Sequence, residues 1–149
     1  MNTALLSLFL LTGTASAQTP DRLVAEIRTA AADACVTVSY SLDATVDEVR
    51  VADKGTVTAQ DDLWCLKGQS VEIYTGPDCT WVLSKESKEA VVEPKWTYED
   101  LEAFYKTLVK AGSGNNVSVK VLSKTMSEKK PASCFMPETG DDWVVTDLR

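Results

Sequence analysis

Residues 55–75 read GTVTAQDDLWCLKGQSVEIYT, and this stretch decides the fold. Apolar and polar residues alternate along it, which is typical of strands that bury one face. Two pairs, Asp61-Asp62 and Gly68-Gln69, interrupt the alternation with residues that favour tight turns. The stretch therefore predicts three consecutive antiparallel strands joined by hairpins.

The predicted turns fix a register. A two-residue turn at Asp61-Asp62 places Trp64 opposite Ala59, and one at Gly68-Gln69 places Trp64 opposite Ile73. A further turn at residues 76–78 then brings Trp81 beside Ile73 and Leu83 beside Val71. One sheet face thereby collects large apolar side chains: Val57, Trp64, Leu66, Val71, Ile73, Trp81 and Leu83. A slip of one residue would mix this set with polar residues, so the pattern favours the register.

Further strands are predicted on both sides of this meander. Residues 35–42 alternate, with Val38 and Tyr40 on the apolar face, and a second strand is expected at about residues 46–52. Another turn of the meander is predicted at residues 85–88, and helical periodicity returns after Pro94. Towards the end of the chain, strands are predicted near residues 117–122, 133–136 and 143–147.

Two amphipathic helices are available to cover the apolar sheet face. Thr19-Pro20-Asp21 is a typical helix start, and apolar residues then recur at helical spacing over residues 20–34. Thr97 and Asp100 resemble a capping box at the start of a second helix. Its apolar stripe consists of Leu101, Phe104, Tyr105 and Leu108. The sequence therefore predicts an α+β fold.

The first 17 residues are typical of a secretory signal peptide. An apolar run from Ala4 to Leu11 ends at Ala15-Ser16-Ala17, a cleavage site of small residues. The run is shorter than the roughly 20 residues that span a bilayer. Because the leader lacks Lys and Arg, a buried N-terminal helix is the alternative. We expect an exported, unanchored, soluble domain over residues 18–149.

Composition excludes several function classes. The net charge of −7 and a pI near 4.6 argue against nucleic acid and anionic lipid surfaces as partners. The chain has no histidine, which excludes Ser-His and Cys-His catalytic pairs. It also lacks a C-x-x-C motif and a phosphate-binding loop. Neighbouring acids such as Glu99 and Asp100 are better explained by the start of a helix. We therefore expect no enzyme activity, metal or cofactor.

Four cysteines remain in the predicted exported domain: Cys35, Cys65, Cys79 and Cys134. An oxidising compartment permits two disulfides in three connectivities. In the predicted register Cys65 faces away from the apolar face, whereas Cys79 shares the face of Trp81. Those two should not pair, whereas a bond between Cys35 and Cys65 is conceivable.

Several segments resemble periplasmic lipoprotein carriers of the LolA type, particularly their Bacteroidetes forms. They are residues 55–58, 63–68, 71–83 and 88–92, together with Phe135-Met136-Pro137 and the closing stretch from Trp143 to Arg149. The chain is shorter than typical carriers. It also lacks the Arg-Pro pair that proteobacterial members carry near the position of Gln60 and Asp61, and it has more cysteines than usual.

The resemblance implies a curved antiparallel sheet, an incomplete β-barrel, with helices as a lid over an apolar cavity. The cargo would be the acyl chains of lipoproteins. As a periplasmic protein, the chain would take them from an inner-membrane exporter and pass them towards an outer-membrane acceptor. We expect it to be a monomer. The implied cavity lining comprises Val38, Tyr40, Val57, Trp64, Leu66, Ile73, Trp81, Leu83, Leu101, Phe104 and Leu108. The alternative is an envelope protein-binding or structural module whose aromatic residues fill a packed interior.

Overall fold

A computed structural model of the chain describes residues 17–46, 48–110 and 117–149. The predicted signal peptide lies almost wholly outside the described residues and stays a prediction. The helices are α1 (Pro20–Ala31), α2 (Tyr98–Lys110) and the short 3-10 helix η2 (Ala132–Phe135). The strands are β1 (Ala17–Gln18), β2 (Cys35–Val46), β3 (Val49–Gln60), β4 (Leu63–Lys67), β5 (Val71–Thr75), β6 (Cys79–Ser84), β7 (Glu89–Pro94), β8 (Val117–Ser127) and β9 (Val144–Asp147).

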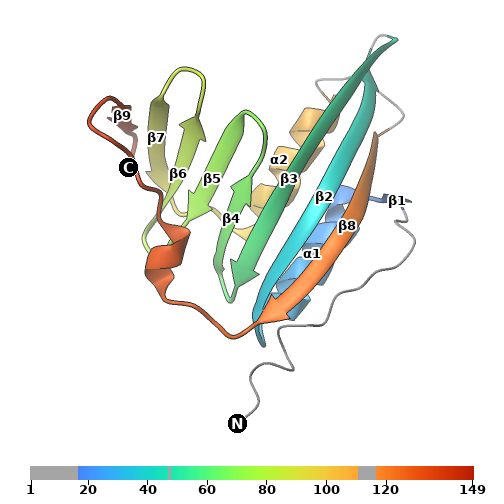
Figure 1. Cartoon of the computed structure of the whole chain (residues 1–149), viewed down its shortest axis with the longest axis horizontal. Coiled ribbons are helices and arrows are strands. Elements are labelled where there is room, and N and C mark those ends of the chain that lie inside the picture. The colour runs from blue at the N-terminus through green and yellow to red at the C-terminus, as the bar shows by residue number, and fades with distance from the viewer. Residues whose placement is uncertain (1–16, 47, 111–116) are drawn as a thin grey trace.

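The nine strands form one open, curved sheet (Figure 1). Their order is β1-β8-β2-β3-β4-β5-β6-β7-β9, and all neighbours are antiparallel except β7 and β9. Both α-helices lie on the same face of the sheet, behind β2, β3 and β4 in Figure 1. The segment that follows β8 crosses the opposite face. The predicted α+β class with a curved, unclosed sheet under helices is thereby confirmed.

The first hairpin has the predicted register, because Trp64 pairs with Ala59 and Leu66 with Val57. The second turn lies at residues 69–70 instead of 68–69, so Leu66 pairs with Ile73. This shift of two residues leaves every side chain on its predicted face.

The third hairpin differs from the predicted register by one residue. The backbone N–H of Gly76 donates a hydrogen bond of 3.0 Å to the carbonyl of Cys79, which leaves only two residues in the turn. Ile73 therefore pairs with Val82, and Tyr74 with Trp81. The prediction that Trp81 and Leu83 share the face of Trp64 is wrong, since a one-residue slip reverses the faces of β6.

Two other predicted elements have different bounds. The strand expected at residues 46–52 continues through the first strand of the meander as the single strand β3. The strand expected at residues 133–136 is instead η2, in which the N–H of Met136 donates to the carbonyl of Ser133. Periodicity does not separate a strand from a single helical turn in so short an apolar run.

The predicted capping box is confirmed at the start of α2. The backbone N–H of Asp100 donates to Thr97 Oγ1, and the N–H of Thr97 donates to Asp100 Oδ2. At α1, Thr19 has extended backbone angles and Pro20 follows it, although the Thr19 side chain makes no capping hydrogen bond. The helix ends at Ala31, three residues before the predicted end.

Candidate functional site

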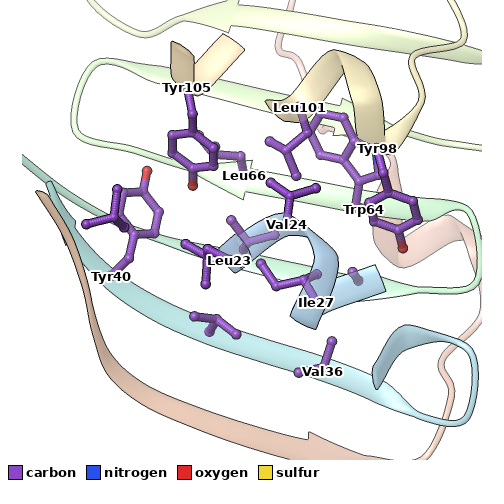
Figure 2. Packing of buried hydrophobic residues seen from close by; sticks show 14 of the residues in the cluster. Leu23, Val24, Ile27, Val36, Tyr40, Trp64, Leu66, Tyr98, Leu101 and Tyr105 are labelled. Atoms are coloured by element: carbon purple, nitrogen blue, oxygen red, sulfur yellow. The ribbon is translucent and has the colours of Figure 1, made fainter. Parts of the chain in front are cut away.

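The candidate site is the apolar interior between the sheet and the two helices, which we call the helix-covered core (Figure 2). Strands β2 to β5 supply its floor, because every second residue of each strand points to this face. Helices α1 and α2 supply the cover. Its fully buried members include Leu23, Ile27, Val36, Val38, Tyr40, Val57, Trp64, Leu66, Ile73, Leu101 and Tyr105.

The structure brings together most of the predicted lining residues. Val38, Tyr40, Val57, Trp64, Leu66, Ile73 and Leu101 all belong to the helix-covered core, and the half-buried Phe104 packs against it. Trp81 and Leu83 belong to a separate cluster on the other sheet face. The side chain of Leu108 lies outside the described residues.

Helix α1 contributes a second set of apolar side chains to this interior. Its residues Leu23, Val24 and Ile27 are at most 3% exposed. In Figure 2 they lie between Val36 of β2 and Leu101 of α2. Their helical spacing identified this stripe in the sequence. The helix was expected to cover the apolar sheet face, but none of its residues was among the predicted lining residues, because the sequence does not fix which residues a helix places against a sheet.

The interior is packed in this structure. Trp64 is 0% exposed, and its ring lies 6.3 Å from that of Trp96 between centroids. Tyr40 and Tyr105 pack edge to face at 5.6 Å. A chain-like ligand therefore needs the helices to move before it can occupy this space.

Two buried polar atoms in this core lack hydrogen-bond partners among the described residues. They are the indole Nε1 of Trp64 and the hydroxyl of Tyr105. An unpaired buried polar group costs about 1–3 kcal/mol, and native cores contain few of them. On the opposite face, Nε1 of the half-buried Trp81 is also unpaired.

Helix α2 is held to the sheet at its first turn. The Tyr98 hydroxyl donates a hydrogen bond of 2.5 Å to the carbonyl of Asp61 in the β3–β4 turn. Burial, together with the charges of Asp62 and Asp61, raises the pKa of Tyr98 well above its ordinary value of 10. The phenol is therefore neutral over the physiological pH range and remains a donor.

Helix α1 is tied to α2 by a contact at the surface, which we call the interhelical latch. It consists of Arg28, Glu99 and Tyr98. Arg28 Nη1 lies 2.7 Å from Glu99 Oε1, and the guanidinium carbon lies 5.8 Å from the Tyr98 ring centroid. The Glu99 backbone N–H and Arg28 together lower the pKa of the Glu99 carboxyl. Both charged side chains are more than half exposed, and exposed ion pairs contribute little to stability.

A surface groove of about 210 Å³ runs along the interhelical latch. Arg28, Glu99 and Glu102 line its rim, and the core residues Val24 and Tyr98 also line it. The groove therefore connects solvent to the boundary of the helix-covered core. A second groove, of about 500 Å³, lies on the other flank of α1 against Lys124 and Met126 of β8.

The opposite sheet face carries its own cluster, which contains Cys35, Cys65, Tyr74, Leu83, Ala90 and Phe135. Phe135 from η2 covers it, and burial raises the pKa of the Cys65 thiol. All four cysteines are free.

The expected separation of Cys65 and Cys79 on opposite faces is wrong, because both occupy the face of Trp81 after the register shift in β6. Cys35 also points to this face. However, β3 lies between the strands that carry Cys35 and Cys65, so the conceivable bond between them would have to cross a whole strand.

Within the described part of the chain, no group of three or more acidic or cysteine side chains could hold a metal ion. None of the described helices is long and apolar enough to cross a membrane. No protein-family model matches the chain, and no curated protein matches its sequence. The resemblance to lipoprotein carriers therefore stays a prediction.

Proposed function

We propose that the protein is a periplasmic carrier that shields an apolar acyl chain, such as that of a lipoprotein, on its way to the outer membrane. One observation carries the proposal: an apolar sheet face is closed by two helices that exposed side chains tie to each other. The predicted export signal is consistent with a protein that works between two membranes.

The proposed mechanism is an exchange of one apolar partner for another. In the closed state Leu23, Val24 and Ile27 of α1 cover the sheet. An acyl chain that replaces them gains about 0.8 kcal/mol for each buried methylene, and the exposure of the helix offsets part of this gain. The net affinity is therefore modest, which permits the cargo to be handed over.

The groove at the interhelical latch is the route that we propose for the chain. It reaches Val24 at the edge of the core, and its opening requires α1 to part from α2 at Arg28 and Glu99. The closed state competes with the ligand, so a weaker latch should give tighter binding.

Titration of the purified protein with a fluorescent acyl probe tests this function. We expect saturable binding that unlabelled acyl chains compete away. Arg28→Ala should bind at most about fivefold more tightly than the wild type, because removal of an exposed ion pair weakens the closed state by no more than about 1 kcal/mol. Arg22→Ala is the matched control, since Arg22 pairs with Glu26 of its own helix, at 3.7 Å, and with no α2 residue whose side chain the structure describes.

Absence of saturable binding by a folded protein would refute the carrier function. Equal affinities of Arg28→Ala and Arg22→Ala would refute the latch as the barrier to binding.

An edge of the sheet supports a second candidate function, that of a protein-binding module with a permanently packed interior. Strand β9 lies at the end of the sheet, and its Val144 and Val145, together with Leu148 just after it, are between 47% and 62% exposed. Exposed apolar edge strands are sites of strand addition. This candidate predicts no probe binding, and it predicts altered self-association in Val145→Lys. The carrier proposal predicts that Val145→Lys binds the probe normally.

A further inference from the structure

Two tyrosines meet at one end of the helix-covered core. Tyr40 comes from β2 and Tyr105 from α2, and each is at most 1% exposed. Their hydroxyls point toward one another in Figure 2. The Tyr105 hydroxyl makes no hydrogen bond of normal geometry with Tyr40 or with another described residue, although the two phenols lie close enough to shift each other's pKa. A phenylalanine would fill the same space without leaving a polar atom unpaired.

The backbone beside this pair makes room for the Tyr40 hydroxyl. A Cβ atom at Gly55 would lie 2.7 Å from Tyr40 Oη and 2.6 Å from the carbonyl oxygen of Lys67. Both distances are too short, so any side chain at position 55 would displace the phenol or the neighbouring strand. Gly55 therefore preserves a position for a hydroxyl group inside an apolar core.

The electrostatics of this region favour a neutral ligand group over an anionic one. Burial raises the pKa of Tyr40 to about 12, and it raises that of Tyr105 well above 10, so both phenols are neutral donors near pH 7. The Tyr40 phenol raises the pKa of Tyr105 further, whereas the Tyr105 hydroxyl lowers that of Tyr40, and the nearby Asp53 adds a smaller upward shift to both. Its carboxylate accepts hydrogen bonds from the backbone N–H groups of Lys54 and Gln69. A second negative charge beside it would be repelled.

We propose that Tyr40 and Tyr105 form a hydrogen-bonding site for a neutral carbonyl, the ester or amide group at the polar end of a bound acyl chain. This inference rests on the proposed carrier function. When the helices part, the Tyr105 hydroxyl donates to the carbonyl oxygen, and the chain extends from this end along Leu66 and Trp64. The unpaired hydroxyl then acquires the partner that it lacks in the closed state.

Competition between three ligands of equal chain length tests the site. The affinities of a methyl ester, the ionised fatty acid and the hydrocarbon are measured by their displacement of a fluorescent acyl probe. The measurement is made on the wild type and on Tyr105→Phe. We expect the ester to bind most tightly to the wild type. Tyr105→Phe should weaken ester binding about two- to tenfold, the contribution of one hydrogen bond, and leave hydrocarbon binding unchanged.

Tyr74→Phe is the matched control. It also removes one phenolic hydroxyl, but from the opposite sheet face, where the group bonds to Glu72 at 2.6 Å. Tyr74→Phe should bind the ester, the ionised acid and the hydrocarbon in the same order of affinity as the wild type.

Three results would overturn the site: an unchanged ester affinity in Tyr105→Phe, an equal loss for ester and hydrocarbon, or tightest binding of the ionised acid. If the probe does not bind to the folded wild type at all, the carrier function itself is refuted instead.

Discussion

Tyr105 is the residue at which stability and the proposed function oppose each other. Its hydroxyl is buried and unpaired, whereas the Tyr98 hydroxyl in the same helix bonds to the β3–β4 turn. We expect Tyr105→Phe to raise the free energy of unfolding by about 1 kcal/mol, because it removes an unpaired buried group. Tyr98→Phe should lower it by roughly 0.5–1.5 kcal/mol, because it removes a hydrogen bond.

Urea unfolding of the two variants beside the wild type measures both changes. A loss of stability in Tyr105→Phe similar to that in Tyr98→Phe would show that the Tyr105 hydroxyl is paired in solution. In that case the Tyr105 hydroxyl would not be available to a ligand.

At the scale of secondary-structure elements, the interhelical latch depends on pH. The pKa of Glu99 is below its ordinary value of 4.5 in the folded protein. A lowered carboxyl pKa contributes stability above the pKa of the unfolded state, and this contribution is lost as the pH falls through the folded-state value. The wild type should therefore be more stable than Glu99→Gln at pH 7, and the difference should disappear towards pH 3.

Urea unfolding of both proteins between pH 7 and pH 3 measures this difference. Glu102→Gln is a control on the same helix, since the ion pair of Glu102 is with Lys106, within α2. A difference between the wild type and Glu99→Gln that persists unchanged at pH 3 would contradict the role of the Glu99 carboxylate.

The elements also show which parts of the fold are encoded locally. The capping box at Thr97 and the hairpin at Asp61-Asp62 involve residues close in sequence, and both were predictable. The sheet face to which Trp81 points was not predictable, because it depends on whether the Gly-Pro-Asp turn leaves two or three residues between the paired strands. The hydrogen bond from Gly76 to Cys79 decides this, and composition does not reveal it.

The candidate site was predictable where it lies on β2 to β5 and less so where helices complete it. Period-two alternation identified Tyr40, Trp64 and Leu66. The pairing of Arg28 with Glu99, 71 positions apart, arises from the docking of α1 against α2, and the surroundings of Tyr105 arise from the docking of α2 against β2. Such contacts between distant residues have no signature in a single sequence.

At the scale of the whole molecule, the C-terminal segment stabilises the sheet face opposite the helices. The Gln60 side chain makes two hydrogen bonds with the backbone of Lys130. Phe135, which is 1% exposed, then packs in the same cluster as Cys65 and Tyr74. Phe135→Ala should lower the free energy of unfolding by about 3–5 kcal/mol. It should also make the Cys65 thiol reactive towards a thiol reagent. Met136→Ala is the control, since Met136 is 43% exposed. Unchanged stability and thiol reactivity in Phe135→Ala would contradict this role.

Hydrogen–deuterium exchange with and without an excess of acyl methyl ester tests most directly whether cargo displaces the helices from the sheet. We predict faster exchange in α1 when the ester is bound, while β3, β4 and β5 exchange as slowly as before or more slowly. Exchange in α1 that stays the same or slows, at an ester concentration that saturates the protein, would contradict the account.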